Sequence, residues 1–523
     1  MKKTPTVSAS GPSDKVVAPD RTDRLVTAAV FVFIGLVYAV SLFLLYPNLP
    51  IIERSPEAIP GFVDNYPPFR VDEDAYYHIS RRILDGTVYT GEGQEIGFTA
   101  GFPLVAAPFV AVFDKMGGYI ANMLIVFISL VVFHQTVRRY GFRKRAAVLT
   151  LTAAFASLEW FYAISNYSEP FAQLLVVIAF FLLAPGRSGR SDGVALLVSG
   201  FLTGLILFVR PHCVLVGLPF FLYIVFSRGK PFFNKRAYRY IGGAACAMLL
   251  WFLRNHLAFG SPFEFEYTRL VGSFAPGMAS SYMKGNIFLG IHGLLFDEYH
   301  GLFTITPIFL LFPAGLHAMW RQGLKWESFA LFGAVALVTL FVASGPYPFT
   351  EFGLGSRHMV PVTLLILFPI AFFLDGKAFT SSIVILAALY SFYQAGIGWF
   401  TGGEPGMGFF TGILNDAQSR AVILTGKGLL PKKTFGTQEE LIRSYEHALK
   451  RANMKDLLQT MDPMVIQNIK GHERDFMLFL CRQPDPKIAI LSADTARGIV
   501  IRNFSITQGF TDSQSPPDTT RAP

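Results

Sequence analysis

Long apolar runs separated by short polar connections occupy most of this chain. Crossing a hydrocarbon core of about 30 Å takes roughly 20 helical residues, and many of the runs between residues 25 and 399 approach that length. The pattern predicts about 11 transmembrane helices, at 25–46, 118–137, 146–165, 170–185, 193–211, 213–227, 238–255, 302–319, 327–345, 358–375 and 379–399. The stretch 102–114 is shorter and contains Pro103 and Pro108, so we expect a re-entrant or interfacial segment there.

The composition supports a membrane protein. Of the 523 residues, 52% are hydrophobic and 15% are charged, which is too apolar for a soluble protein of this length. The formal net charge is +9, but the basic residues are divided among short connections and form no continuous face with interleaved aromatic residues. This distribution argues against nucleic-acid binding. The predicted fold class is an all-α polytopic membrane protein.

Lysine and arginine occupy every second connection between the predicted spans. They precede the first span and recur at 138–145, 187–190, 228–239, 321–325 and Lys377. Short loops rich in these residues stay in the cytoplasm. We therefore expect an integral, multi-pass protein of the cell (plasma) membrane with a cytoplasmic N-terminus. An odd number of spans then places the C-terminus on the extracytoplasmic side.

Polar segments mark the domain boundaries. Residues 1–24 are polar and rich in Pro and Ser, which predicts a disordered cytoplasmic N-terminus. Residues 25–400 form the predicted transmembrane domain, with a long first outer loop at 47–117. Residues 401–510 are expected to form an extracytoplasmic C-terminal module, and 511–523 a disordered tail.

The module has the sequence pattern of a small α/β fold. Apolar residues at helical spacing within 436–460 predict one or two amphipathic helices. The segments 487–494 and 496–506 are typical of strands. No disulfide is expected, because the three cysteines, Cys213, Cys246 and Cys481, show no framework of paired spacings.

Three consecutive acids stand in the first outer loop, in the stretch RVDEDAYYHISRRILD at 70–85. Apolar residues at helical spacing follow them, which predicts an amphipathic helix along the outer membrane surface. Asp72 and Glu73 then lie at its N-terminus, where acids cap a helix and complement its dipole. Three adjacent acids also repel one another unless a cation or a substrate offsets the charge. The residues alone leave both interpretations open, a helix cap and a functional site.

The spacing of this stretch resembles a family signature. The matching residues are Asp72, Glu73, Tyr76, Ile79, Ser80, Arg81 and Leu84. They are similar to the signature of the GT-C integral-membrane glycosyltransferases, closest to the group of protein O-mannosyltransferases and lipid A aminoarabinose transferases. Two further stretches resemble the same group: Arg254-Asn255 with 259–263, and 293–296 with 301–303 and Pro307. The likeness covers roughly residues 25–375; the third acid, Asp74, and the tail depart from the pattern.

The resemblance implies a GT-C-like fold and an activity. Such enzymes transfer a sugar, a hexose or a pentose, from a polyprenyl-phosphate donor to an acceptor on the extracytoplasmic side of a membrane. The acceptor class, whether lipid, glycan or protein, stays open. By resemblance Asp72 is the general base of an inverting transfer. Glu73 then orients the acceptor or Asp72, and Asp74 is a further candidate for the cavity.

A departing phosphate needs cationic partners, and arginine binds phosphate in bidentate fashion. The candidates at the predicted outer surface are Arg81, Arg210, Arg254 and Arg357. Each has an alternative role, because basic residues at span ends extend to the membrane interface. We favour Arg210 and Arg357 for phosphate binding, since the positive-inside rule accounts for basic residues at cytoplasmic span ends but not at outer ones. Glu169 and His358 are secondary candidates for the same cavity.

The sequence specifies no metal site. Asp297, Glu298 and His300 lie close together but lack a specific ligand spacing, so no metal is assigned and a divalent-metal requirement stays open. Asn166-Tyr-Ser and Asn503-Phe-Ser match the N-glycan acceptor pattern in a host that has that machinery.

Two functions from other classes stay open. A transporter or flippase of a lipid-linked saccharide would share the span number but would show ionisable residues within spans and two similar halves. The predicted spans are almost free of charge and no repeat is evident. A carrier-binding scaffold without catalysis is excluded only by the acid cluster. A related enzyme, an oligosaccharide polymerase or ligase, would differ in its donor.

Overall fold

The structure is a computed structural model, and it describes the following residues: 21–45, 71–87, 98–184, 190–227, 234–264, 287–296, 301–345, 355–374, 377–400, 487–493 and 501–507. The chain forms two compact units, Met1–Phe409 and Phe410–Pro523. Each unit is considered by itself. The predicted helices within 436–460, residues 1–20, the predicted disordered tail at 511–523 and Cys481 lie outside the described residues. Arg21–Arg24 belong to the first helix, so the predicted disorder of 1–24 is wrong for these four residues.

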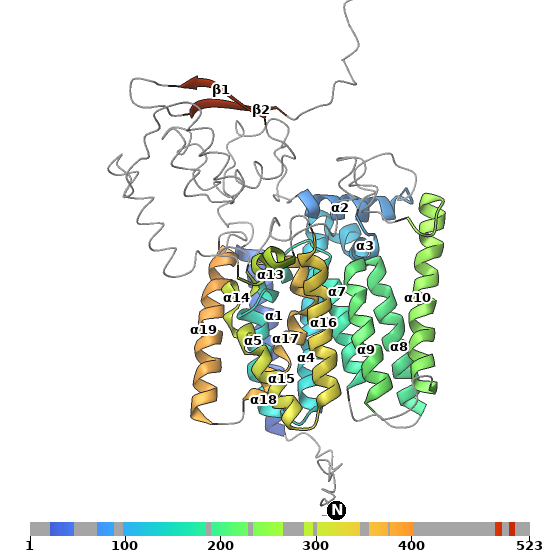
Figure 1. The fold of residues 1–523 in the computed structure, drawn as a ribbon, viewed down its shortest axis with the longest axis vertical. Helices are drawn as coiled ribbons and strands as arrows, with labels where there is room; N and C mark the ends of the chain where they lie inside the picture. The colour runs from blue at the N-terminus through green and yellow to red at the C-terminus, as the bar shows by residue number, and fades with distance from the viewer. Residues whose placement is uncertain are drawn as a thin grey trace, which may run out of the picture. The chain divides into compact units, whose positions relative to one another are not determined.

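The first unit is helical, and most of its helices run side by side while α2 lies across one end of the bundle (Figure 1). The elements up to α9 are α1 (Arg21–Val40), the π-helical turn η1 (Ser41–Leu45), α2 (Val71–Leu84), α3 (Gly101–Phe113), η4 (Asp114–Met116), α4 (Gly117–Arg139), α5 (Arg143–Phe155), α6 (Glu159–Ala163), α7 (Glu169–Leu183), α8 (Arg190–Leu205), η5 (Ile206–Phe208), η6 (Pro211–Val216) and α9 (Gly217–Phe226). They are followed by α10 (Lys235–Phe259), α13 (Ile287–Phe296), α14 (Leu302–Ile305), η7 (Pro307–Leu311), α15 (Phe312–Arg321), α16 (Lys325–Ala343), η8 (Arg357–Met359), α17 (Val360–Leu367), α18 (Ile370–Phe373) and α19 (Ala378–Phe400).

Four helical stretches among the described residues are long and apolar enough to cross a membrane: Arg21–Phe43, Gly101–Arg139, Lys325–Ala343 and Ala378–Gly396. Four shorter apolar helical stretches are Glu169–Leu183, Asp192–Phe208, Pro211–Phe226 and Arg357–Phe373. The expected number of about 11 spans is therefore not confirmed, although the apolar helical architecture is.

Several predicted spans are divided in the structure. The span expected at 146–165 consists of α5 and α6 with a break at 156–158. The span expected at 302–319 consists of α14, η7 and α15, with a break before Pro307, which has no N–H to donate and therefore interrupts the helical hydrogen bonds. Apolar periodicity predicted helices in these segments correctly but could not show where each helix breaks.

The stretch expected to be re-entrant or interfacial contains α3, a separate helix of 13 residues. Asp114, with φ 49°, ends α3, and η4 connects it to α4. A Cβ atom on Gly117 would collide with the backbone of Phe109 and Val110, because α3 folds back closely against the start of α4. A helix of this length spans about 20 Å, which is less than a bilayer requires.

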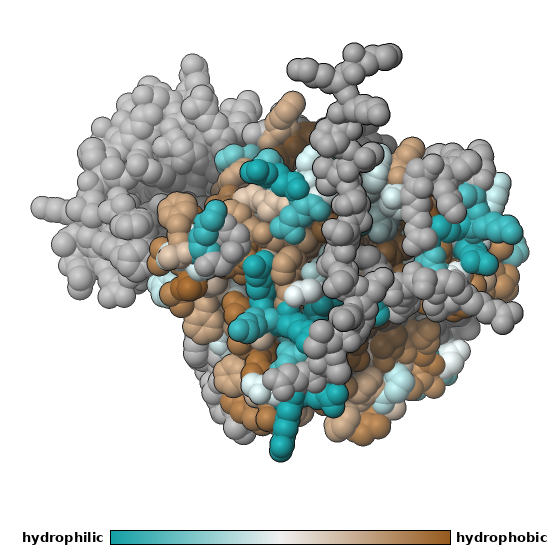
Figure 2. All heavy atoms as spheres, turned by 90° about the horizontal axis from the view of Figure 1, so that it is seen from below, coloured by the Kyte–Doolittle hydropathy of each residue, from teal (hydrophilic) through white to brown (hydrophobic). Residues whose placement is uncertain are grey.

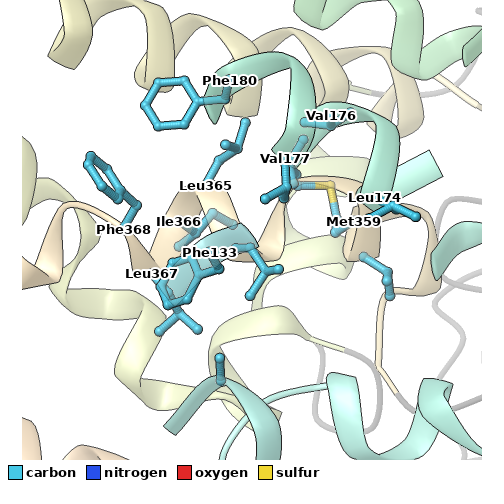
Figure 3. Packing of buried hydrophobic residues seen from close by; sticks show 14 of the residues in the cluster. Phe133, Leu174, Val176, Val177, Phe180, Met359, Leu365, Ile366, Leu367 and Phe368 are labelled. Atoms are coloured by element: carbon cyan, nitrogen blue, oxygen red, sulfur yellow. The ribbon is translucent and has the colours of Figure 1, made fainter. Parts of the chain in front are cut away.

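The centre of the bundle is a large cluster of buried apolar side chains. Figure 3 shows Phe133 of α4, Phe180 of α7 and Phe368, the residue directly after α17, within it. The rings of Phe180 and Phe368 meet edge to face with centroids 5.3 Å apart, a favourable aromatic geometry. Helices α4, α7 and α17 therefore form the rigid frame to which the peripheral helices attach.

The N-terminal ends of α1 and α10 and the C-terminal end of α4 lie at the same end of the bundle (Figure 1). Arg138 of α4 pairs with Asp23 of α1 at 2.6 Å, and Arg236 of α10 pairs with Asp192 of α8. Seen from this end, hydrophilic residues gather in patches on a largely hydrophobic surface (Figure 2). The described basic ends of α1, α4 and α10 thus lie at one end of the bundle, as predicted for cytoplasmic connections, while the orientation itself stays a prediction.

The second unit contains two antiparallel strands, β1 (Lys487–Ala493) and β2 (Ile501–Thr507). Lys487 lies opposite Thr507 and Ile490 opposite Phe504, with a register irregularity at Ser492. The two predicted strands are confirmed, the second starting later than expected. The α/β character of the whole module stays a prediction.

Helices α8 and α10 pack through glycine. A Cβ atom on Gly243 would collide with the carbonyl oxygen of Leu197 in α8, and one on Gly200 with the carbonyl oxygen of Tyr240 in α10. Small residues at both positions let the two backbones approach, the arrangement typical of membrane helix pairs.

We predict opposite effects for two neighbouring substitutions in α10. Gly243→Ala should destabilise the protein by about 1–3 kcal/mol because it overpacks the α8 contact. Gly242→Ala should be neutral or stabilising by about 0.5–1 kcal/mol, because its Cβ would meet nothing within 4 Å. Thermal unfolding in detergent measures both. Equal stability of the two variants would contradict the close packing.

Candidate active site

The acid stretch begins a helix, as predicted. Asp72 and Asp74 lie in the first turn of α2, and Arg81 and Arg82 in its last turn. Tyr76 and Ile79 are buried on one side, and the Ser80 hydroxyl donates to the carbonyl of Pro103 in α3 at 3.2 Å. The helix is therefore packed along one side against the bundle.

Glu73 fastens α2 to the loop that precedes α7. Its side chain is buried, and its Oε1 accepts a hydrogen bond from the backbone N–H of Asn166 at 2.9 Å. Asn166 Nδ2 in turn donates to the backbone carbonyl of Glu73 at 2.7 Å. A further hydrogen bond of 2.9 Å joins the hydroxyls of Tyr76 and Ser168. The acid-bearing helix is thus held directly against residues 166–168.

Helix α4 holds the same loop from another side. Asn122 Nδ2 donates to the carbonyls of Ser165 and Tyr167, each at 2.7 Å. A Cβ atom on Gly118, one turn earlier, would collide with the Asn166 side chain. Asn166 is only 2% exposed, so the folded protein does not present the Asn166-Tyr-Ser pattern as a glycan acceptor.

Glu169 begins α7 immediately after this loop and is fully buried. Its Oε1 accepts a hydrogen bond from Arg210 Nη2 and lies 3.6 Å from Arg357 Nε and 4.0 Å from His358 Nδ1. Its Oε2 accepts no hydrogen bond from the described residues. A buried carboxylate is costly unless it is paired, and here two guanidinium groups lie beside it.

Arg210 is positioned by backbone contacts around it. It lies between η5 and η6, and the preceding residue, Val209, accepts a hydrogen bond from the Thr99 hydroxyl at 2.6 Å. A Cβ atom on Gly101, at the start of α3, would collide with the carbonyl of Phe208. The segment that leads into α3 therefore fixes the path of the chain just before Arg210.

Arg357 and His358 lie in η8, after a turn at Gly355 with φ 68°. The Ser356 hydroxyl donates to the carbonyl of Leu294 in α13 at 2.8 Å. The Arg357 guanidinium carbon is 5.2 Å from the centre of the Tyr167 ring, within the range of a cation–π contact. The structure thus brings together four of the predicted site residues, Glu169, Arg210, Arg357 and His358.

His212 belongs to the same cluster, although the sequence analysis did not select it. Its ring stacks on Phe341 of α16, with centroids 5.7 Å apart and planes at 4°, and it meets the His358 ring edge to face at 5.5 Å. The sequence feature that could have identified His212 as a site residue is its position two residues after Arg210. The partner ring on α16 could not be inferred from local sequence.

A second buried polar network lies one helical turn further along α7. Gln173 Nε2 donates to Glu159 Oε1 at 2.7 Å and to the Val360 carbonyl at 2.8 Å. The Thr363 hydroxyl also lies 2.7 Å from Glu159 Oε1. These bonds join α6, α7 and α17 and so set the spacing between Glu169 and Arg357. Glu159 is a fully buried acid inside the predicted span 146–165, an exception to the near absence of charge expected within spans.

The remaining candidates lie elsewhere in the described contacts. Arg81 is exposed on α2. Arg254 of α10 donates to Asn255 at 3.0 Å and lies over the Phe259 ring at 5.0 Å. Asp297, Glu298 and His300 lie outside the described residues. Within the part of the chain that the structure describes, no group of three His, Cys, Asp or Glu residues could hold a metal ion.

The cluster around Glu169 has the chemistry of an anion site. It places two guanidinium groups and two imidazole rings near a single carboxylate. Cations exceed anions among these side chains, and guanidinium groups bind the oxygens of phosphate well. Through residues 166–168 the cluster is joined to the helix that begins with the acids.

Comparison with solved structures finds a similar fold. The ArnT crystal structure from Cupriavidus metallidurans bound to undecaprenyl phosphate superposes with a TM-score of 0.50 at 16% identity, covering 87% of this chain and 74% of that one. The apo structure of the same enzyme gives 0.44 at 15% identity, with coverage of 88% and 74%. An Archaeoglobus fulgidus oligosaccharyltransferase tethered to an acceptor peptide gives 0.39 at 12% identity, with coverage of 72% and 55%.

A scan against protein-family models and a search of curated protein sequences find no match. The likeness to ArnT, a lipid A aminoarabinose transferase, confirms the GT-C-like fold that the resemblance implied. The chain has the GT-C fold of integral-membrane glycosyltransferases.

Proposed function

We propose that this chain is a membrane glycosyltransferase that moves a sugar from a polyprenyl-phosphate carrier to an acceptor on the extracytoplasmic side. The observation that carries the proposal is the buried cluster of Arg210 and Arg357 around Glu169, directly after the residues bonded to α2. A base and a phosphate site must lie close together for such a transfer. The ArnT structure, bound to undecaprenyl phosphate, supports a ligand of this class.

In the proposed reaction Asp72 takes the proton from the acceptor hydroxyl. The acceptor oxygen attacks the anomeric carbon on the face opposite the phosphate, so the configuration inverts. The bond between the anomeric carbon and the phosphate oxygen breaks, and its electron pair stays on the phosphate. Arg210 and Arg357 stabilise the charge that develops there. The sugar is a hexose or a pentose, and the acceptor a lipid, a glycan or a protein.

Glu73 acts as a positioning residue in this proposal. Its described hydrogen bonds go to Asn166, and Asn166 lies in the loop just before Glu169. The pair therefore sets the first turn of α2, and with it Asp72, relative to the cationic cluster. Of the two roles expected for Glu73, orienting Asp72 is the one that these contacts favour.

The proposed topology places this site outside the cytoplasm. The acid-bearing helix and the loop before α7 both belong to outer connections when the basic connections are cytoplasmic. The N-terminus is then cytoplasmic and the C-terminal module extracytoplasmic, on the side where the acceptor is met.

Asp72→Asn should reduce transfer by at least about 100-fold, because the amide keeps the shape of the side chain and lacks the base. The assay measures release of polyprenyl phosphate by purified protein in detergent, from a panel of synthetic polyprenyl-phosphate sugars with membrane extract as acceptor. Asp74→Asn is the matched control and should retain transfer. Retained transfer by Asp72→Asn would remove Asp72 from the mechanism. A folded wild-type protein inactive with every donor would favour the transporter alternative.

Arg210→Gln and Arg357→Gln should each weaken binding of undecaprenyl phosphate by roughly 10- to 100-fold, since each removes a charge-assisted hydrogen bond to the phosphate. Arg236→Gln is the matched control, because it also breaks an arginine–carboxylate pair between separate segments, the one with Asp192. Isothermal titration in detergent gives the affinities. If the control weakens binding as much as the other two, general loosening of the bundle explains the loss.

Glu73→Ala should lower the free energy of unfolding by about 1–3 kcal/mol, because it leaves the buried N–H of Asn166 without its acceptor. It should also lower kcat while leaving the affinity for undecaprenyl phosphate within about twofold, because the arginines remain in place. Glu73→Gln keeps an acceptor oxygen and should restore most of both quantities. A kcat that does not recover in Glu73→Gln would show that the carboxylate charge itself is required.

A further inference from the structure

Arg210 has a buried hydrogen-bond donor that its ion pair does not use. Its Nη2 donates to Glu169, whereas its Nε is buried and has no hydrogen-bond partner among the described residues. This nitrogen always carries hydrogen, because arginine stays protonated in proteins. A buried donor without an acceptor is costly, and in native structures such a group usually bonds to water or to a ligand. The Nε atom therefore indicates an acceptor from outside the described residues.

His212, two residues further along the chain, has the same property. Its Nε2 is buried, and neither ring nitrogen makes a hydrogen bond with the described residues. An imidazole ring always carries at least one proton on a nitrogen. One face of this ring stacks on Phe341, with centroids 5.7 Å apart and planes at 4°. The covered face leaves the ring edge, where the nitrogens lie, for a polar partner.

Another buried histidine shows how this chain satisfies an imidazole within its core. His134 Nδ1 lies 3.0 Å from the Thr150 hydroxyl, and that hydroxyl donates its own hydrogen to the Ala146 carbonyl at 2.7 Å. The hydroxyl must therefore accept from Nδ1, which places the ring proton of His134 on that nitrogen. The ring proton of His212 has no such acceptor in the described part of the chain. Packing against Phe341 alone does not account for a histidine at position 212.

The turn at 210–213 holds the two donors together. The Cys213 N–H donates to the Arg210 carbonyl at 2.9 Å, and the Cys213 side chain is fully buried. Pro211 lies between Arg210 and His212 and has a fixed φ. The His212 ring also meets the His358 ring, with centroids 5.5 Å apart. Both donors are therefore fixed in the cluster by contacts that do not involve their unpaired nitrogens.

We propose that His212 is a phosphate-binding residue, whose Nε2–H donates a hydrogen bond to an oxygen of the polyprenyl phosphate. The inference rests on the proposed function and adds a third ligand to its phosphate site. A phosphate group has several strong acceptor oxygens, so it can receive the Arg210 and His212 donors at the same time. The bond requires a proton on Nε2, which either a neutral or a charged ring can carry.

The test compares variants that remove or keep a donor at the position of Nε2. His212→Phe keeps an aromatic ring against Phe341 and removes both nitrogens. It should weaken binding of undecaprenyl phosphate by about tenfold or more, the effect of losing a hydrogen bond to a charged group. A glutamine amide reaches about as far as Nε2, and an asparagine amide only about as far as Nδ1. His212→Gln should therefore retain most of the affinity, and His212→Asn should lose it. Isothermal titration of the full chain in detergent gives the affinities.

One variant and two further probes control for other effects. His134→Phe makes the same replacement at the buried histidine of α4 and should leave the affinity unchanged. Undecaprenol has the same chain without the phosphate, and His212→Phe should bind it as the wild type does. Inorganic phosphate has the phosphate without the chain. Displacement of undecaprenyl phosphate by an equal concentration of inorganic phosphate would assign the site to free phosphate and overturn the inference.

The outcomes separate this inference from the proposed function. If Arg210→Gln and Arg357→Gln weaken binding of undecaprenyl phosphate while His212→Phe does not, the inference is overturned and the phosphate site stands. The inference is also overturned if His212→Phe weakens binding of undecaprenol as much. If the arginine variants leave the affinity unchanged, the proposed phosphate site is wrong, and the inference fails with it. If His212→Phe does not fold, the amide variants decide, because equal affinities of His212→Gln and His212→Asn overturn the inference.

Discussion

The burial of the Glu169 carboxylate is the constraint on which the arrangement of this site depends. A carboxylate at the start of a helix is common and is favoured there by the helix dipole. One removed from water needs cations nearby, and the cations come from two distant parts of the chain, the connection between η5 and η6 and the short helix η8. The ion pairs therefore fix three segments of the bundle relative to one another. Each is supported by close packing at a glycine: a Cβ atom would meet the Phe208 backbone at Gly101, the Asn166 side chain at Gly118 and the Leu158 side chain at Gly355.

The site is assembled in layers along α7. Next to the charged layer lies the loop at 165–168, which carries the bonds to α2 and α4. One turn further into the bundle, Gln173 bridges Glu159 and α17 with hydrogen bonds. Beyond that the contacts are apolar, with Phe180 against Phe368. The hydrogen bonds and ion pairs are thus concentrated at one end of α7, and apolar packing holds the rest of the helix. A functional group is positioned well when a packed scaffold of this kind supports it.

Much of the scaffold could be predicted from the sequence. The apolar runs, the helix that begins with the acids and the two strands of the second unit follow from periodicity, a local property of the chain. The breaks within spans could not be predicted, because the break at 156–158 contains no proline and depends on packing. Glu169, Arg210 and Arg357 were selected from their positions at span ends. Their meeting at one carboxylate, like the stacking of His212 on Phe341, depends on tertiary contacts between segments far apart in the sequence.

The close contact between Gly118 and Asn166 has a consequence for how this scaffold can change. The side chain of Asn166 occupies the space that a Cβ atom at position 118 would need, and its amide bridges to Glu73. A side chain larger than glycine at position 118 is excluded while Asn166 is present, so it would require a smaller residue at position 166. The segment that carries α2, the start of α4 and the loop before α7 are therefore structurally coupled. An attempt to graft one acid-bearing loop into a related scaffold would have to transfer the start of α4 and the loop before α7 with it.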